Sequence, residues 1–167
     1  MSDDTTGDTV PRITSAAEWA QAVAWAVHSS AEARSRHIWC VDEDYAEWPL
    51  DDRSLLDALT RWLQLPQRRL TLLAAHWQGV PRRHARFTAW RREWSHAIDT
   101  LALPVEQRPA WSAALVDNQR IALQLHDRER WRGVATQDPG QAMLLRHEVD
   151  ALTQRSTPDF PVTQLGL

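Results

Sequence analysis

Residues 38–75 decide the fold of this chain and read IWCVDEDYAEWPLDDRSLLDALTRWLQLPQRRLTLLAA. The segment begins and ends with short apolar runs, residues 38–41 and 70–75, which are typical of buried strands. Between them the apolar positions follow a helical spacing, with Asp51 placed to cap the helix and Pro66 to end it. The stretch therefore predicts two strands of one sheet connected by a helix.

The preceding and following segments continue this alternation. Ser15 and Glu18 form a capping box, which predicts a first helix from residue 14 or 15. Pro81 favours the first turn of a third helix, and residues 100–103 indicate a third strand. We therefore expect helices and strands to alternate as far as residue 103.

The last third of the chain predicts a hairpin and a closing helix. Strands are expected at residues 112–116 and 120–125, around Asp117-Asn118, a pair that suits a tight turn. Residues 126–137 are expected to form a charged loop. Asp138-Pro139 then opens the last helix as its N-cap and first residue.

This order of elements predicts an α/β fold with one domain. We expect a mixed, mostly parallel sheet with helices on both faces and a C-terminal β-hairpin plus helix. The polar, acidic residues 1–12 are expected to be a disordered N-terminal tail, residues 13–156 the single domain, and residues 157–167, with two prolines, an irregular C-terminal tail.

Composition narrows the class of protein. The chain has 167 residues, of which 43% are hydrophobic and 25% charged, as in ordinary packed domains. A single cysteine, Cys40, lies in an apolar run, which favours a buried thiol and a reducing compartment. No apolar stretch is long enough for a membrane span, and no signal-peptide pattern opens the chain, so we expect a cytoplasmic protein without membrane contact.

The charged residues exclude several mechanisms. The chain contains no lysine, so all 19 basic residues are arginines. This excludes a phosphate-loop lysine, a Schiff-base lysine and a lysine general base.

No Gly-x-Ser-x-Gly motif of serine hydrolases is present among the five glycines. The ten tryptophans divide into core positions and positions that suit an interface.

Residues 110–117 carry a pattern that resembles the phospholipase D superfamily. They are followed by a second strand, a loop and a helix that ends in residues 148–152, as in the C-terminal part of a phospholipase D half-domain. In that superfamily the strand carries His-x-Lys-x4-Asp. With Asp117 on the motif aspartate, Ser112 occupies the place of the lysine and Ala110 that of the histidine. The superfamily's histidine forms a phosphohistidine and its lysine binds phosphate, so the resemblance implies the fold and argues against the activity.

A closer similarity is to an uncharacterised bacterial group of degenerate phospholipase D-like domains, found alone or attached to acetyltransferase domains of the GNAT type. It covers roughly residues 34–165 and is carried by residues 70–98 and by the end of the chain from Arg132-Gly133. Half-domains of the superfamily usually pair. The resemblance therefore implies a homodimer, or a protein partner such as an acetyltransferase.

A candidate cleft comprises Asp42, Asp44, His76, Asp117 and His126. Ligands of open parallel sheets bind beyond the carboxyl ends of strands, where the first three of these residues are expected. In the phospholipase D fold, the segment after the hairpin borders the active cleft, which adds His126. The group could act in acid-base chemistry, or it could be polar because strand ends reach solvent. No spacing typical of metal ligands is present, and we expect neither a metal nor another cofactor.

A second candidate is an anion site formed by Arg82, Arg83, His84 and Arg86. Arginines in the first turns of a helix, beside outward-pointing backbone N–H groups, suit a phosphate or another anion. The alternative, which we favour, is a solvated face whose arginines pair with Glu93 or with acidic loops.

Three functions remain open. The first is a non-catalytic binding or regulatory module whose cleft holds an anionic small molecule or a partner protein. The second is an enzyme, of hydrolase or phosphotransferase type, that uses His76 or His126 with a carboxylate. The third is a weak nucleic-acid binder through the arginine-rich third helix. A formal net charge of −3 argues against strong nucleic-acid binding.

Overall fold

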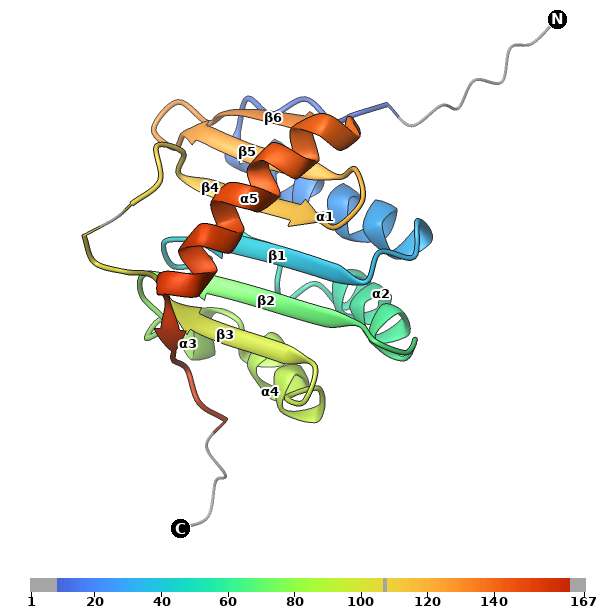
Figure 1. Cartoon of the computed structure of the whole chain (residues 1–167). Helices are drawn as coiled ribbons and strands as arrows, with labels where there is room; N and C mark the ends of the chain where they lie inside the picture. The colour runs from blue at the N-terminus through green and yellow to red at the C-terminus, as the bar shows by residue number, and fades with distance from the viewer. Residues whose placement is uncertain (1–8, 107, 163–167) are drawn as a thin grey trace, which may run out of the picture.

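The computed structural model describes residues 9–106 and 108–162 (Figure 1). The strands are β1 (His37–Asp42), β2 (Arg69–Ala74), β3 (Ile98–Ala102), β4 (Ala113–Asp117), β5 (Ala122–Asp127), β6 (Arg132–Thr136) and β7 (Thr157–Pro158). The helices are α1 (Ala16–Glu32), α2 (Arg53–Leu63), α3 (Val80–Arg83), α4 (Ala85–Glu93) and α5 (Pro139–Arg155). The described strands form one sheet in the order β6-β5-β4-β1-β2-β3-β7.

The sheet is mixed, as expected, but parallel pairing does not dominate it. β1 pairs in parallel with β2, and β2 with β3, because α2 and the α3–α4 segment each return the chain to the end of the sheet where the preceding strand began. The other four pairings among the described strands are antiparallel. The expectation of a mostly parallel sheet is therefore wrong in this detail, since β4 pairs antiparallel with β1, and the unexpected strands β6 and β7 add two more antiparallel pairings.

β6 lies within the segment expected to be a charged loop. Its side chains alternate between exposed and half-buried, which is the pattern of an edge strand with one covered face. A tight turn precedes it, in which Trp131 adopts a φ of 53° and the Asp127 carboxylate accepts two backbone N–H bonds. Charged residues on an exposed edge strand are easily mistaken for a loop.

Residues 157–162 also differ from the expected irregular tail. Thr157–Pro158 form β7 beside β3. The Phe160 ring then stacks on Trp77, with centroids 5.0 Å apart, and the Arg91 guanidinium lies 4.0 Å from the Phe160 centroid. The packed fold therefore extends beyond residue 156. Most of the expected N-terminal tail, residues 1–8, and the last residues, 163–167, lie outside the described part.

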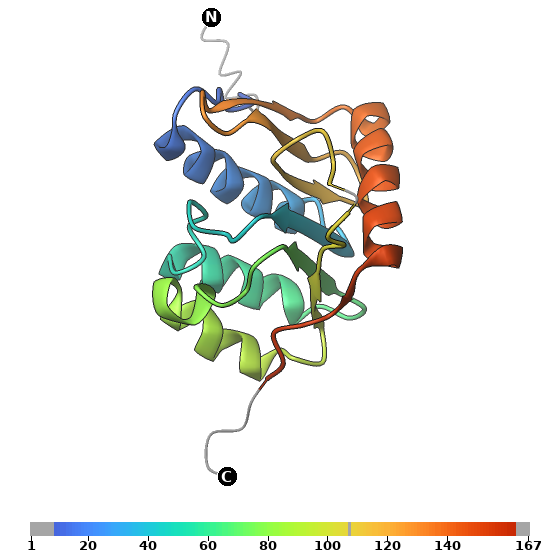
Figure 2. The same cartoon turned by 90° about the vertical axis from the view of Figure 1, so that its left-hand side faces the viewer.

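Two apolar cores hold the layers together, one on each face of the sheet. Figure 2 shows α1, α2, α3 and α4 on one face and α5 on the other. The larger core contains Trp19, Leu59, Trp62 and Phe87, and the smaller core joins Leu145 and Val149 of α5 to the sheet. These residues face inward because apolar residues recur every three or four positions along each helix.

Local signals place the helices, with two differences from expectation. Ser15 caps α1 as predicted, and Asp138 caps α5. Asp52, not Asp51, caps α2, because the Asp51 carboxylate instead accepts the backbone N–H of Phe87 at 3.1 Å. The expected third helix is broken at residue 84 into α3 and α4.

Candidate functional site

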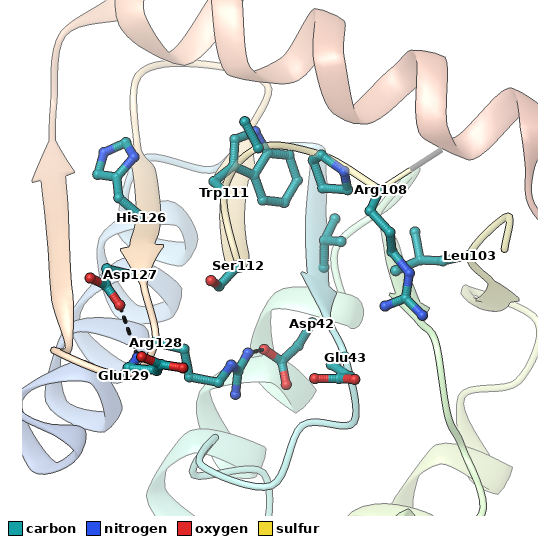
Figure 3. Close-up of a pocket in the computed structure, with 13 residues that line it drawn as sticks. Asp42, Glu43, Leu103, Arg108, Trp111, Ser112, His126, Asp127, Arg128 and Glu129 are labelled. Atoms are coloured by element: carbon teal, nitrogen blue, oxygen red, sulfur yellow. Dashed lines mark hydrogen bonds and ion pairs between the residues drawn. The ribbon is translucent and has the colours of Figure 1, made fainter. Parts of the chain in front are cut away.

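The largest described groove lies where β1 and β5 end and β4 begins. It has a volume of about 650 Å³ and opens to solvent (Figure 3). Its lining residues are Val41, Asp42, Glu43, Leu103, Arg108, Pro109, Ala110, Trp111, Ser112, His126, Asp127, Arg128 and Glu129. The carboxyl end of β1 was expected to border a cleft, and the segment after β5 was also expected to do so.

The two positions aligned with the superfamily's histidine and lysine both line this groove. Ala110 is exposed just before β4, and Ser112 is half-buried, with its backbone N–H donating to the Leu125 carbonyl at 2.7 Å. Neither side chain can attack phosphorus as an imidazole does, and neither carries a positive charge. The groove therefore lacks a nucleophile and a cation at the two places where the resemblance would put them.

Asp42 and Arg128 form an ion pair across the groove (Figure 3). The Asp42 carboxylate also accepts the backbone N–H groups of Asp44 and Tyr45, at 3.2 and 2.7 Å. Burial raises the pKa of Asp42, and the Arg128 guanidinium and these hydrogen bonds oppose that rise. The pair neutralises a buried carboxylate, so Arg128 adds no net positive charge to the groove.

The remaining charged side chains of the groove are more exposed. Arg108, Glu43 and Glu129 are exposed, and their side chains form no ion pair with a described residue. Asp127 pairs with Arg130 outside the groove at 3.3 Å. Beyond the neutralised pair, the groove thus presents more carboxylates than cations.

Trp111 connects the groove to α5. Its side chain is buried in the smaller core, and its Nε1 donates to the Glu148 carboxylate at 2.7 Å. The bond fixes the indole ring at the groove wall, because a buried Trp N–H needs an acceptor. The position of this wall therefore depends on the packing of α5.

The five candidate cleft residues do not all come together. Asp42 and His126 line the groove, whereas Asp44 and His76 do not. Asp44 instead faces Arg83, at 3.7 Å, and His76 is exposed after β2. Among the described residues, neither His76 nor His126 forms an ion pair with a carboxylate.

Asp117 lies at the opposite end of β4 from the groove, so its placement in the cleft is wrong. It is fully buried, and its Oδ2 accepts the hydroxyls of Ser30 and Ser35 at 2.9 and 2.6 Å. Its Oδ1 accepts the backbone N–H groups of residues 119–121, each at 2.9 Å. The aspartate that aligns with the superfamily pattern thus holds the β4–β5 turn and the end of α1.

The expected anion site is also rearranged. His84 is buried and its Nε2 lies 2.8 Å from the Tyr45 carbonyl, so its inclusion in an exposed anion site is wrong. Arg83 donates to the Asp44 carbonyl at 2.9 Å, and Arg86 to the Asp51 carbonyl at 3.4 Å. Arg82 is exposed. The pairing of Arg83 with an acidic loop agrees with the solvated-face alternative, and α3 has only four residues.

Sequence reasoning missed Arg108, Trp111 and the partner of Asp42, Arg128. Arg128 belongs to the charged segment that follows β5, and its charge complements the aspartate at the end of β1. Reading those two strand ends as neighbours could have suggested the pair. No sequence signal placed Arg108 near them, since residue 108 lies in a connecting segment without regular structure.

The described part of the chain contains neither a cluster of metal ligands nor a membrane-spanning helix. No group of three or more His, Cys, Asp or Glu side chains there is arranged to hold a metal ion. None of the described helices combines the length and the apolar character that crossing a membrane requires.

Solved structures show what the fold is similar to. An archaeal chromatin protein, TrmBL2, described as showing a novel mode of DNA binding, matches with a TM-score of 0.62 and 11% identity over 93% of this chain and 57% of its own. Phosphatidylserine synthase from Haemophilus influenzae Rd KW20 matches with a TM-score of 0.53 and 11% identity, over 89% of this chain and 38% of its own. Nuc from Salmonella typhimurium, a phospholipase D family member, matches with a TM-score of 0.54 and 7% identity, over 81% of this chain and 89% of its own.

These matches establish the fold as phospholipase D-like and, at such low identity, nothing finer. The chain spans 57% and 38% of the length of the first two matched proteins. No family model and no curated protein sequence matches the chain.

Proposed function

We propose that this chain is a non-catalytic phospholipase D-like domain that binds a partner protein in the groove beside β4. The observation that carries the proposal is that Ala110 and Ser112 line the groove where the superfamily pattern has its nucleophile and its phosphate-binding cation. A scaffold without these two groups retains a concave, polar surface, which suits recognition better than phosphoryl transfer.

The charge balance of the groove favours a basic or mixed-charge protein segment over a small phosphate. Arg128 is neutralised by Asp42, which leaves Arg108 facing a groove that also contains the exposed carboxylates Glu43 and Glu129. A multiply charged anion would be repelled by these carboxylates, whereas a segment with arginine or lysine side chains would be attracted. The partner is either a second copy of this chain or another protein, such as an acetyltransferase.

A single reactive cysteine in the groove tests this proposal. Cys40 is buried, so Ser112→Cys places the accessible thiol in the groove and Ser95→Cys places it on a distant exposed turn. Each purified variant is labelled at that thiol with a photo-crosslinker and illuminated in a lysate of its host cell. We expect Ser112→Cys to crosslink one defined protein, and adding Glu43→Arg and Glu129→Arg to abolish that product, while Ser95→Cys gives none.

Two results would refute the proposal. The first is identical crosslinking from Ser112→Cys and Ser95→Cys. The second is phosphodiesterase turnover by the purified chain that His126→Ala abolishes, which would support the enzyme alternative instead. The mass of the crosslinked product also separates a homodimer from a complex with another protein.

A second candidate function is nucleic-acid binding, and one observation favours it. The matched chromatin protein is described as binding DNA, and its similarity covers 93% of this chain. Its test is the salt dependence of binding to a DNA duplex, since phosphate contacts release counterions. Arg82, Arg83 and Arg86 are the site expected from the sequence, and their triple replacement by Ala would remove binding if they carry it.

A further inference from the structure

Three arginines lie at the end of the sheet opposite the groove, where β1 and β2 begin. Arg34 and Arg36 belong to the α1–β1 connection, and Arg68 immediately precedes β2. The backbone N–H of Arg69 donates to the Arg36 carbonyl at 3.0 Å, which brings the two connections side by side. Figure 1 shows both connections at the same end of the sheet, where β1 and β2 begin.

Within the described residues, no carboxylate neutralises this arginine cluster, formed by Arg34, Arg36 and Arg68. None of the ion pairs found there includes any of the three. Arg68 has a buried Nε without a hydrogen-bond partner, while its Nη1 donates to the Pro66 carbonyl at 2.8 Å. Burial, together with the charges of Arg36 and Arg34, lowers the pKa of Arg68. The buried Nε and the lack of an ion pair with a described carboxylate leave the charge of Arg68 uncompensated there, which favours a bound anion.

The nearby helix ends account for only part of the cluster. α1 and α2 both end near this edge, and the partial negative charge at helix carboxyl ends attracts arginines. That attraction is weak at exposed positions and does not satisfy the buried Nε of Arg68. The backbone of Arg34 also has a φ of 56°, a conformation that favours glycine. The local backbone therefore does not explain why this position carries an arginine.

The cluster continues onto the neighbouring β4–β5 turn. The backbone N–H of Arg36 donates to the Asn118 side chain at 2.9 Å, and Gln119 donates to the Ala33 carbonyl at 3.1 Å. Arg120, on the same turn, is exposed. Because β4, β1 and β2 are adjacent in the sheet, the backbone segments that carry these arginines lie side by side in a row about 10 Å wide. A row offers separate guanidinium groups to successive phosphates, whereas a single phosphate needs them to converge.

We propose that Arg34, Arg36 and Arg68, extended by Arg120, bind the phosphodiester backbone of a nucleic acid without reading its sequence. This inference rests on nucleic-acid binding as the second candidate function, and it replaces the α3–α4 arginines with a different surface. The site is separate from the groove, which lies at the other end of the same strands.

The test compares two triple variants with the same loss of charge. Fluorescence anisotropy measures the affinity of the full chain for a short labelled DNA duplex at several salt concentrations. We expect Arg34→Gln/Arg36→Gln/Arg68→Gln to weaken binding at least about 10-fold at about 50 mM salt and to reduce the slope of log affinity against log salt by about 2–3. The matched control replaces Arg82, Arg83 and Arg86 with Gln, and we expect it to keep the affinity within about 3-fold.

The outcomes separate the site from the function. If the control loses binding and the cluster variant keeps it, the proposed site is wrong and the nucleic-acid function stands. If the unmodified chain binds no duplex at low salt, both fail. If phosphatidylserine vesicles bind through the same arginines and DNA does not, the cluster serves a membrane surface and the proposal is overturned. Should Arg68→Gln disturb folding, as thermal unfolding would show, the pair Arg34→Gln/Arg36→Gln is compared with Arg82→Gln/Arg86→Gln, which removes the same charge.

Discussion

Replacing Asp117 tests whether this buried aspartate holds the fold or serves the groove. Its carboxylate accepts five hydrogen bonds, two from serine hydroxyls and three from the backbone of residues 119–121. Asp117→Ala would leave Ser30, Ser35 and the N–H of Ile121, all buried, without this acceptor. A buried unsatisfied donor costs about 1–3 kcal/mol, and hydroxyls can turn towards other acceptors, so we expect the free energy of unfolding to fall by about 3–4 kcal/mol.

Asp117→Asn should be much milder. Its amide oxygen can accept the backbone N–H groups while its NH₂ donates to the serine hydroxyls, so we expect a loss of about 1 kcal/mol. Urea unfolding followed by tryptophan fluorescence measures both variants. With an m-value of about 2 kcal/mol/M, the Asp117→Ala midpoint falls by about 1.5–2 M.

The control is Asp57→Ala, which removes an exposed carboxylate from α2. Its unfolding free energy should change by less than about 0.5 kcal/mol. If Asp117→Ala shifts the midpoint no more than this control, the hydrogen bonds do not stabilise the turn and the reasoning is refuted. Asp117→Asn should also leave groove crosslinking from Ser112→Cys unchanged, because the two sites lie at opposite ends of β4.

Three further predictions concern buried groups. Arg128→Ala leaves the buried Asp42 carboxylate without its counterion, so we expect a loss of about 3 kcal/mol in unfolding free energy at pH 8. Because burial raises the pKa of Asp42 above its unfolded value, part of this loss should disappear at pH 5, and an equal loss at both pH values would contradict the argument. For His37, burial and the charge of Arg69 lower the pKa to about 4, so the folded state favours the neutral ring and loses stability as the pH falls from about 6.5 to 4. His37→Gln should reduce this loss by about 2 kcal/mol, a value that allows for solvent screening because the ring is partly exposed. If the urea midpoints of the two proteins depend on pH in the same way, the ring does not contribute. Burial also raises the pKa of the Cys40 thiol, so a disulfide reagent should modify it only at the rate of unfolding, and rapid labelling of the native chain would disprove its burial.

Features that depend on a few neighbouring residues followed from the sequence. The apolar runs at residues 38–41 and 70–75 predicted β1 and β2, and the cap residues Ser15 and Asp138 marked the starts of α1 and α5. The phospholipase D-like fold was also expected from the pattern around Asp117, and the solved structures agree with it. Helix caps and buried strands are local because their hydrogen bonds and apolar spacing involve residues within one or two turns.

The candidate site depended on contacts that the sequence does not bring together. Asp42 and Arg128 are 86 residues apart, and Asp117 and Ser30 are 87 apart, so nothing local indicated either pairing. β6 was not predicted because an edge strand needs only one apolar face. α3 and α4 were predicted as one helix because the turn at His84 depends on its hydrogen bond to the distant Tyr45 carbonyl. Sequence thus predicted most of the segments that form the layers, and it fixed the small side chains at positions 110 and 112. Tertiary structure alone decided which charges meet, because the partner of a charged side chain is chosen by the packing of distant strands and not by its neighbours in the chain.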